Sequence, residues 1–118
     1  MRNTVWIGGF VLAAALVSSA STARAETVTG EVIDMSCYLG HGETGRGPSH
    51  KKCAETCAKK GLPMGLLTDD KQVWVLLEDH DNPKAYATAI GQAAQTITVD
   101  GRKVTQGGVN GLLVEDVK

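Results

Sequence analysis

Aromatic side chains are scarce in this sequence, whose 118 residues include two Trp, two Tyr and one Phe. Beyond residue 25 only Tyr38, Trp74 and Tyr86 remain. Proteins that bind single-stranded nucleic acids stack the bases on aromatic rings. A chain with so few rings lacks the stacking platforms that this class of protein needs.

An excess of basic residues is missing as well. The whole chain has a formal net charge of −1. Without its first 25 residues, which include Arg2 and Arg24, it has ten basic residues against 13 acidic ones, a net charge of −3. Sequence-independent binding to phosphate backbones requires a basic surface. We therefore expect no nucleic-acid partner.

Motifs of known catalytic chemistry are also absent. The glycines of residues 40–47 are not followed by the Gly-Lys-Ser/Thr of a phosphate-binding loop. No local signature of a Ser-His-Asp triad occurs, and no carboxylate pair lies in apolar surroundings. Residues 78–81 (Glu-Asp-His-Asp) are interpreted as a solvated turn, with a weak cation site as the alternative. We expect a binding protein rather than an enzyme.

A long apolar run occurs only at the N terminus. Residues 5–17 (VWIGGFVLAAALV) follow Arg2 and are too few for a comfortable transmembrane span. Ala23 and Ala25 form a small-residue cleavage site, so we predict a signal peptide over residues 1–25, cleaved before Glu26. An uncleaved anchor is disfavoured by the polar residues that interrupt the run. The protein is expected to be periplasmic or secreted, exported unfolded, and not held at the membrane after cleavage.

Residues 26–118 predict one small domain in which short strands and two helices alternate. Val28, Gly30 and Val32 alternate with polar residues, which is typical of a strand. A helix is predicted between Ser49, a favourable N-cap, and Gly61, a favourable stop. The expected strands cover residues 27–35, 63–68, 71–78, 95–106 and 112–117, and the expected helices cover 50–60 and 81–95.

The predicted order of elements is, apart from the first helix, that of an OB-fold. We therefore expect a mainly β (α+β) domain. It would be a five-stranded OB-like barrel with an inserted Cys-bearing helix between strands 1 and 2 and a second helix between strands 3 and 4. Asp100-Gly101 is interpreted as a kink within strand 4, because the Gly107-Gly108 turn follows soon after. A hairpin at Asp100-Gly101 would instead give six strands.

The inserted helix carries an unusual face. His50, Cys53 and Cys57 are separated by three and four residues, so all three fall within an arc of roughly 60° on one side of the helix. Cys37 follows the first strand, and His41 lies four residues beyond it. This helical spacing predicts that one imidazole and two thiols point in the same direction, toward the thiol of Cys37.

A metal site would use the thiols of all three cysteines. Cys37, His50, Cys53 and Cys57 would form a Cys₃His set, with His41 as a further candidate ligand. A tetrahedral Cys₃His shell is normal for structural Zn(II), and thiolate-rich shells also suit Cu(I). We therefore predict a periplasmic protein that binds Cu(I) or Zn(II), with another periplasmic protein as a further candidate partner.

Two other functions of the cysteines stay open. A disulfide from Cys37 to Cys53 or Cys57 would staple the helix to the barrel of a non-catalytic binding module and leave one free thiol. Cys53 and Cys57 should not pair with each other, because Cβ atoms four residues apart on a helix are about 5–6 Å apart and a disulfide needs about 3.5–4.5 Å. A low-pKa Cys53 or Cys57 could instead exchange disulfides with a partner.

Two resemblances accompany these patterns. Cys53-x-x-x-Cys57 with a distant His is similar to the copper site of periplasmic copper chaperones of the oxidase-assembly type. That similarity is limited to the three ligands, because those proteins have a thioredoxin-like order of elements. The wider pattern CYLG…H-x-x-C-A-x-x-C…G-x-P resembles small exported bacterial proteins with an OB-like barrel. This second resemblance implies a family and a fold, and it implies no activity.

Overall fold

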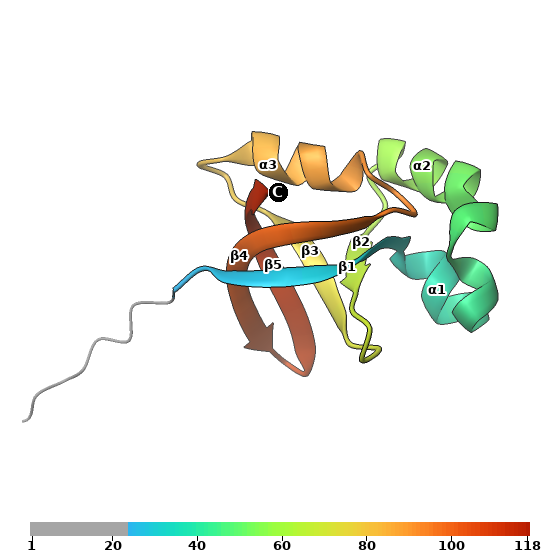
Figure 1. Ribbon diagram of the computed structural model, residues 1–118, viewed down its shortest axis with the longest axis horizontal. Coiled ribbons are helices and arrows are strands. Elements are labelled where there is room, and N and C mark those ends of the chain that lie inside the picture. The colour runs from blue at the N-terminus through green and yellow to red at the C-terminus, as the bar shows by residue number, and fades with distance from the viewer. Residues whose placement is uncertain (1–23) are drawn as a thin grey trace, which may run out of the picture.

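The computed structural model describes residues 24–118, so nearly all of the predicted signal peptide, residues 1–25, lies outside the described residues. The described chain forms five strands and three α-helices (Figure 1). The elements are β1 (Glu26–Asp34), α1 (Met35–His41), α2 (Lys51–Lys59), β2 (Met64–Leu67), β3 (Val73–Glu78), α3 (Pro83–Ile90), β4 (Thr96–Gln106) and β5 (Val109–Val117). Among these residues no helix is both long enough and apolar enough to cross a membrane.

The strands close into a barrel in the order β1-β2-β3-β5-β4. Strands β3 and β5 pair in parallel, and every other neighbouring pair is antiparallel. One helical insertion lies between β1 and β2, and α3 lies between β3 and β4. The predicted five-stranded OB-like barrel with two helical insertions is therefore confirmed.

The fourth strand is continuous, as predicted. Its register against β5 shifts between Asp100 and Gly101, which marks a bulge rather than a hairpin. Gly101 is needed at this bend because a Cβ there would lie 2.9 Å from Leu112 Cδ1 and closer still to the Leu113 carbonyl oxygen. The six-stranded alternative is excluded.

The barrel interior is filled by apolar side chains from all five strands. The fully buried residues that the helical segments add to this core are small: Ala54 from α2, Ala89 from α3, and Ala93 from the turn after α3. Tyr86 and Ile90 of α3 pack against the core while remaining partly exposed. Alanine at these contacts lets a helix approach the barrel closely, because no long side chain separates the backbones. Figure 1 shows α3 lying across one end of the barrel, with α2 beside it and α1 beyond the end of β1.

Three local predictions differ from the structure. The segment after β1 was expected to be a loop, yet Met35–His41 is helical because Asp34 caps it. Ser49 is not an N-cap, since a 3₁₀ turn (Pro48–His50) precedes α2 and places His50 at the cap position without a side-chain hydrogen bond. Helix α3 ends at Ile90, and residues 91–94 form turns instead of continuing it.

Candidate metal centre

The insertion between β1 and β2 is closed at its base by backbone pairing. Asp34, the last residue of β1, pairs with Met64, the first residue of β2. The Met35 N–H also donates to the Pro63 carbonyl at 3.1 Å. Residues 35–63 therefore leave and re-enter the barrel at one point, so α1 and α2 must lie close together above the end of β1.

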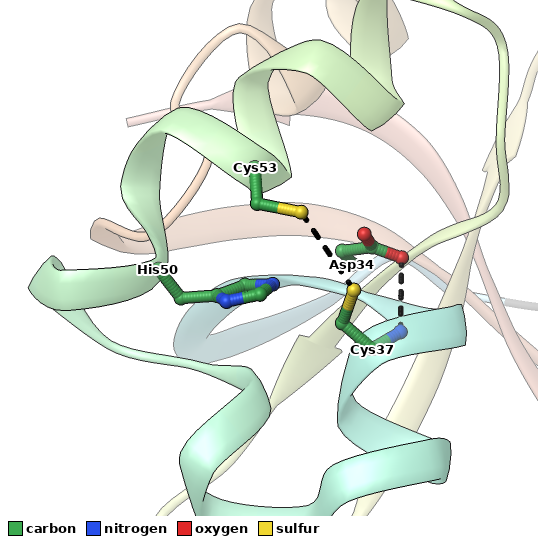
Figure 2. A group of neighbouring side chains, drawn as sticks. All are labelled: Asp34, Cys37, His50 and Cys53. Atoms are coloured by element: carbon green, nitrogen blue, oxygen red, sulfur yellow. Dashed lines mark hydrogen bonds between the residues drawn. The ribbon is translucent and has the colours of Figure 1, made fainter.

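Four side chains that can bind a metal meet at this point. Each of Asp34, Cys37, His50 and Cys53 offers one ligand atom, and these atoms all lie within 4.8 Å of one another. Asp34 ends β1, Cys37 lies in the first turn of α1, His50 precedes α2, and Cys53 lies in its first turn. Figure 2 shows the His50 ring and both sulfurs directed toward the space beside the Asp34 carboxylate.

Asp34 organises the base of the group. Its Oδ1 accepts hydrogen bonds from the N–H groups of Ser36 at 2.9 Å and Cys37 at 3.3 Å, which fixes the start of α1. The residue is completely buried, and it is the only charged residue that is buried among residues 24–118. Sequence reasoning missed Asp34 because it was placed inside the first strand, residues 27–35, and no helix was predicted after that strand. An Asp directly before a helix start three residues ahead of a Cys is the signal that could have revealed it.

The two nearest sulfurs are not bonded. Cys37 Sγ and Cys53 Sγ lie 3.8 Å apart, and all three cysteines of residues 24–118 are free thiols. Cys53 is exposed, whereas Cys37 and His50 are half-buried. The predicted convergence of Cys37 on the face of the inserted helix is therefore present, and one thiol of the pair is accessible from outside.

Two predicted ligands lie outside the group of four. Cys57 is half-buried one helical turn further along α2, and nearby Asp34 is the main cause of the raised pKa of its thiol. His41 is exposed at the end of α1. The group thus contains three of the predicted ligands, Cys37, His50 and Cys53, together with Asp34 in place of a third sulfur.

The carboxylate also controls protonation of the thiols. Interaction with Asp34, followed by burial, raises the pKa of Cys37 to about 12 and that of Cys57 to about 11. Burial alone would raise the pKa of Asp34 itself. Its interactions with the Cys57 and Cys37 thiols and with two backbone N–H groups outweigh burial, and that pKa is lowered. Without a metal, Cys37 and Cys57 are neutral thiols beside an ionised carboxylate, so Cys57 is not the low-pKa nucleophile that disulfide exchange needs.

Two buried polar atoms in this group have no hydrogen-bond partner. They are Asp34 Oδ2 and His50 Nε2, and neither has a hydrogen-bond partner of normal distance and angle among residues 24–118, although thiols lie near the carboxylate. Buried polar atoms are nearly always paired, since an unpaired one retains its full desolvation cost. Both belong to side chains of the one cluster in residues 24–118 whose donors are close enough to share a metal ion.

The loop between α1 and α2 is held in place rather than free. Arg46 pairs with Glu31 on β1 and with Glu43 in the loop, and Lys71 from the β2–β3 turn also pairs with Glu43. Gly45 is buried against the backbone of α1. These contacts fix α1, which carries Cys37, relative to the barrel.

No family model, curated protein or solved structure matches the chain. The functional inference therefore rests on the geometry of the site.

Proposed function

We propose that this protein is exported from the cytosol and binds one thiophilic metal ion, Cu(I) or Zn(II), above the end of β1. The ion is held by Cys37, His50 and Cys53 together with a fourth ligand from β1 or α2. Its role is binding a metal for stability or for handling in the periplasm, not catalysis. We also propose membership of the small exported bacterial barrel proteins that share its Cys/His pattern.

One observation carries this proposal. Asp34 Oδ2 and His50 Nε2 are buried without partners, and the sulfurs of Cys37 and Cys53 lie beside them. A hydrogen-bonded core arrangement would pair these atoms, whereas a metal ion satisfies all four at once. Nitrogen and thiolate donors in this number are typical of Zn(II) and Cu(I) sites.

The test is metal retention by matched histidine variants. The reduced chain is loaded with Zn(II) or Cu(I), freed of excess metal, and measured by elemental analysis and native mass spectrometry. We expect one ion per chain in the wild type, a sharp loss of Zn(II) in His50→Ala, a sharp loss of either metal in Cys53→Ser, and full retention in His41→Ala, because His41 lies outside the group. A wild-type protein that retains neither metal would refute the function.

The predicted export has its own measurement. When the full chain is expressed in a bacterium that secretes proteins, the product should appear outside the cytosol and begin at Glu26. N-terminal sequencing determines this start. An intact N terminus in the cytosolic fraction would contradict export and leave the metal assignment standing.

The short contact between Cys37 and Cys53 favours a second candidate, a binding module stapled by a disulfide. Their sulfurs are 3.8 Å apart and a disulfide needs about 2.05 Å, so only a small approach of α1 to α2 separates them from bonding geometry. The oxidant would be another protein's disulfide: exchange with it forms the Cys37–Cys53 bond and leaves that protein with two thiols. The disulfide uses two of the metal ligands, so the two functions exclude each other. Native protein with one free thiol, no metal and a Cys37–Cys53 bridge would support the staple.

A further inference from the structure

The two oxygens of Asp34 have different environments. Oδ1 accepts two backbone hydrogen bonds at the start of α1, while Oδ2 is buried without a partner. A carboxylate needed only as a helix cap would use one oxygen and leave the other to solvent. Here the second oxygen is closed off from solvent within the cluster that contains Cys37, His50 and Cys53.

No positive side chain neutralises this carboxylate. The ion pairs of residues 24–118 involve Arg46, Lys51, Lys71, Lys103 and Lys118, and none includes Asp34. Two backbone N–H groups donate to the carboxylate and offset its desolvation, but they bring no positive charge. A bound cation would supply the counter-charge that no Lys or Arg of residues 24–118 provides.

The two candidate metals differ in their preference for a carboxylate oxygen as a ligand. Zn(II) is bound by Cys, His and Asp in four-coordinate sites, whereas Cu(I) selects soft sulfur ligands. Two thiolates and a carboxylate together carry three negative charges. The site therefore keeps a net charge of −1 when it holds Zn(II) and of −2 when it holds Cu(I). Because Asp34 is fully buried, the smaller residual charge is the less costly one.

On the basis of the metal-binding function proposed above, we propose that Asp34 is the fourth ligand and that it makes the site selective for Zn(II) over Cu(I). The coordination shell is then Asp34, Cys37, His50 and Cys53, with one carboxylate oxygen, two sulfurs and one imidazole nitrogen. Asp34 both begins α1 and binds the metal, so the ion connects the barrel to both inserted helices.

Cys57 provides the contrasting ligand set. It lies one helical turn beyond Cys53 on the same side of α2, is half-buried, and is outside the group of four. Cu(I) would use the three sulfurs of Cys37, Cys53 and Cys57 and leave the buried carboxylate unneutralised. Each metal therefore depends on a different residue, Asp34 for Zn(II) and Cys57 for Cu(I).

The experiment compares Asp34→Asn with Cys57→Ser. Asparagine retains an Oδ1 acceptor for the start of α1 and is as good an N-cap as aspartate, but its amide replaces the ligand oxygen. Affinities for Zn(II) and for Cu(I) under anaerobic, reducing conditions are measured by competition with chromogenic chelators. Circular dichroism shows whether each variant is folded.

We expect Asp34→Asn to lose at least about 100-fold in Zn(II) affinity, because altering even a residue that only supports a ligand costs 10–100-fold. Its Cu(I) affinity should not fall, because the removed charge opposes Cu(I), and Cys57→Ser should lose Cu(I) affinity while retaining Zn(II). Unchanged Zn(II) affinity in folded Asp34→Asn would overturn the assignment and leave the metal-binding function intact. A wild type that binds neither metal would refute both.

X-ray absorption of the Zn(II)-loaded wild type needs no variant and keeps the proposal testable if Asp34→Asn does not fold. The assignment requires two sulfur ligands at about 2.3 Å and two nitrogen or oxygen ligands at about 2.0–2.2 Å. Three sulfurs would show that Cys57 replaces Asp34. In that case the selectivity proposal fails while metal binding stands.

Discussion

Gly45 lies against the backbone of α1, so its replacement by alanine tests how firmly the loop between the helices positions Cys37. A Cβ at residue 45 would lie 2.6 Å from the Cys37 carbonyl carbon and 3.0 Å from Tyr38 N. Neither atom belongs to a flexible side chain that could turn away. The Cβ would lie closer still to the Cys37 carbonyl oxygen, so either the loop or α1 must move by roughly 1 Å to reach ordinary van der Waals contact.

The expected cost follows from that overlap. Inserting a methyl group into a packed region costs about 1–3 kcal/mol, and contact with rigid backbone places Gly45→Ala at the upper end. In a domain of this size each kcal/mol changes Tm by about 4–8 °C, so we expect Tm to fall by about 10–20 °C. Thermal unfolding of the metal-free protein, followed by circular dichroism, measures the change.

Gly40 provides the matched control. It lies within α1, and no atom lies within 4 Å of the Cβ that alanine would add there. Alanine is about 1 kcal/mol more favourable than glycine inside a helix, so Gly40→Ala should be neutral or stabilising. Replacing glycine by alanine is thus expected to lower Tm at residue 45 and to leave it unchanged or raise it at residue 40.

Metal affinity should change with the displacement. Binding sites require their ligands to be held within about 0.5 Å, so moving α1 by more than this should weaken metal binding in Gly45→Ala. Gly40→Ala should bind as the wild type does. If the two variants have equal Tm and equal metal affinity, the loop does not position Cys37 and the reasoning fails.

Two further predictions concern protonation in the metal-free protein. The pKa of Asp34 is lowered from its ordinary value of 3.8, so its stabilising contribution is complete above about pH 4 and is lost as the pH falls through the folded-state pKa. The urea midpoint should therefore fall more steeply below pH 4 in wild type than in Asp34→Asn, and parallel curves would contradict this. Iodoacetamide at pH 8 should label exposed Cys53 before Cys37 and Cys57, whose pKa values are about 12 and about 11. Peptide mapping that found equal labelling of the three thiols would count against the protonation described for this site.

Much of the barrel could be predicted because local patterns coincide with tertiary packing. Val28 and Val32 alternate with polar residues along β1 and are buried in the barrel, as the period of two requires. The bend at Gly101 was predictable because the Gly107-Gly108 turn left no room for another hairpin. Pro83 begins α3 within the helix predicted over residues 81–95, and proline suits a helix start because an N–H there would have no partner inside the helix.

The candidate site was predictable only in part. Helical spacing placed His50 and Cys53 on one side of α2, and the structure brings both to the same cluster. The helix at Met35–His41 is short and contains Gly40, so its pattern resembled a loop. Its start depends on Asp34 Oδ1, a contact that single-residue propensities do not reveal. Missing this helix also concealed Asp34 as a member of the cluster.

By itself the sequence determined the five strands, the two helical insertions and a set of thiols and imidazole aligned along one helix, because each follows from the repeat distance of a local backbone. Only the tertiary structure decided which of these groups meet. Pairing of Asp34 with Met64 closes the insertion and brings Cys37 to 3.8 Å from Cys53. The same closure buries Asp34 beside them. Contact between residues distant in the chain depends on where the strands end, and no local pattern records that position.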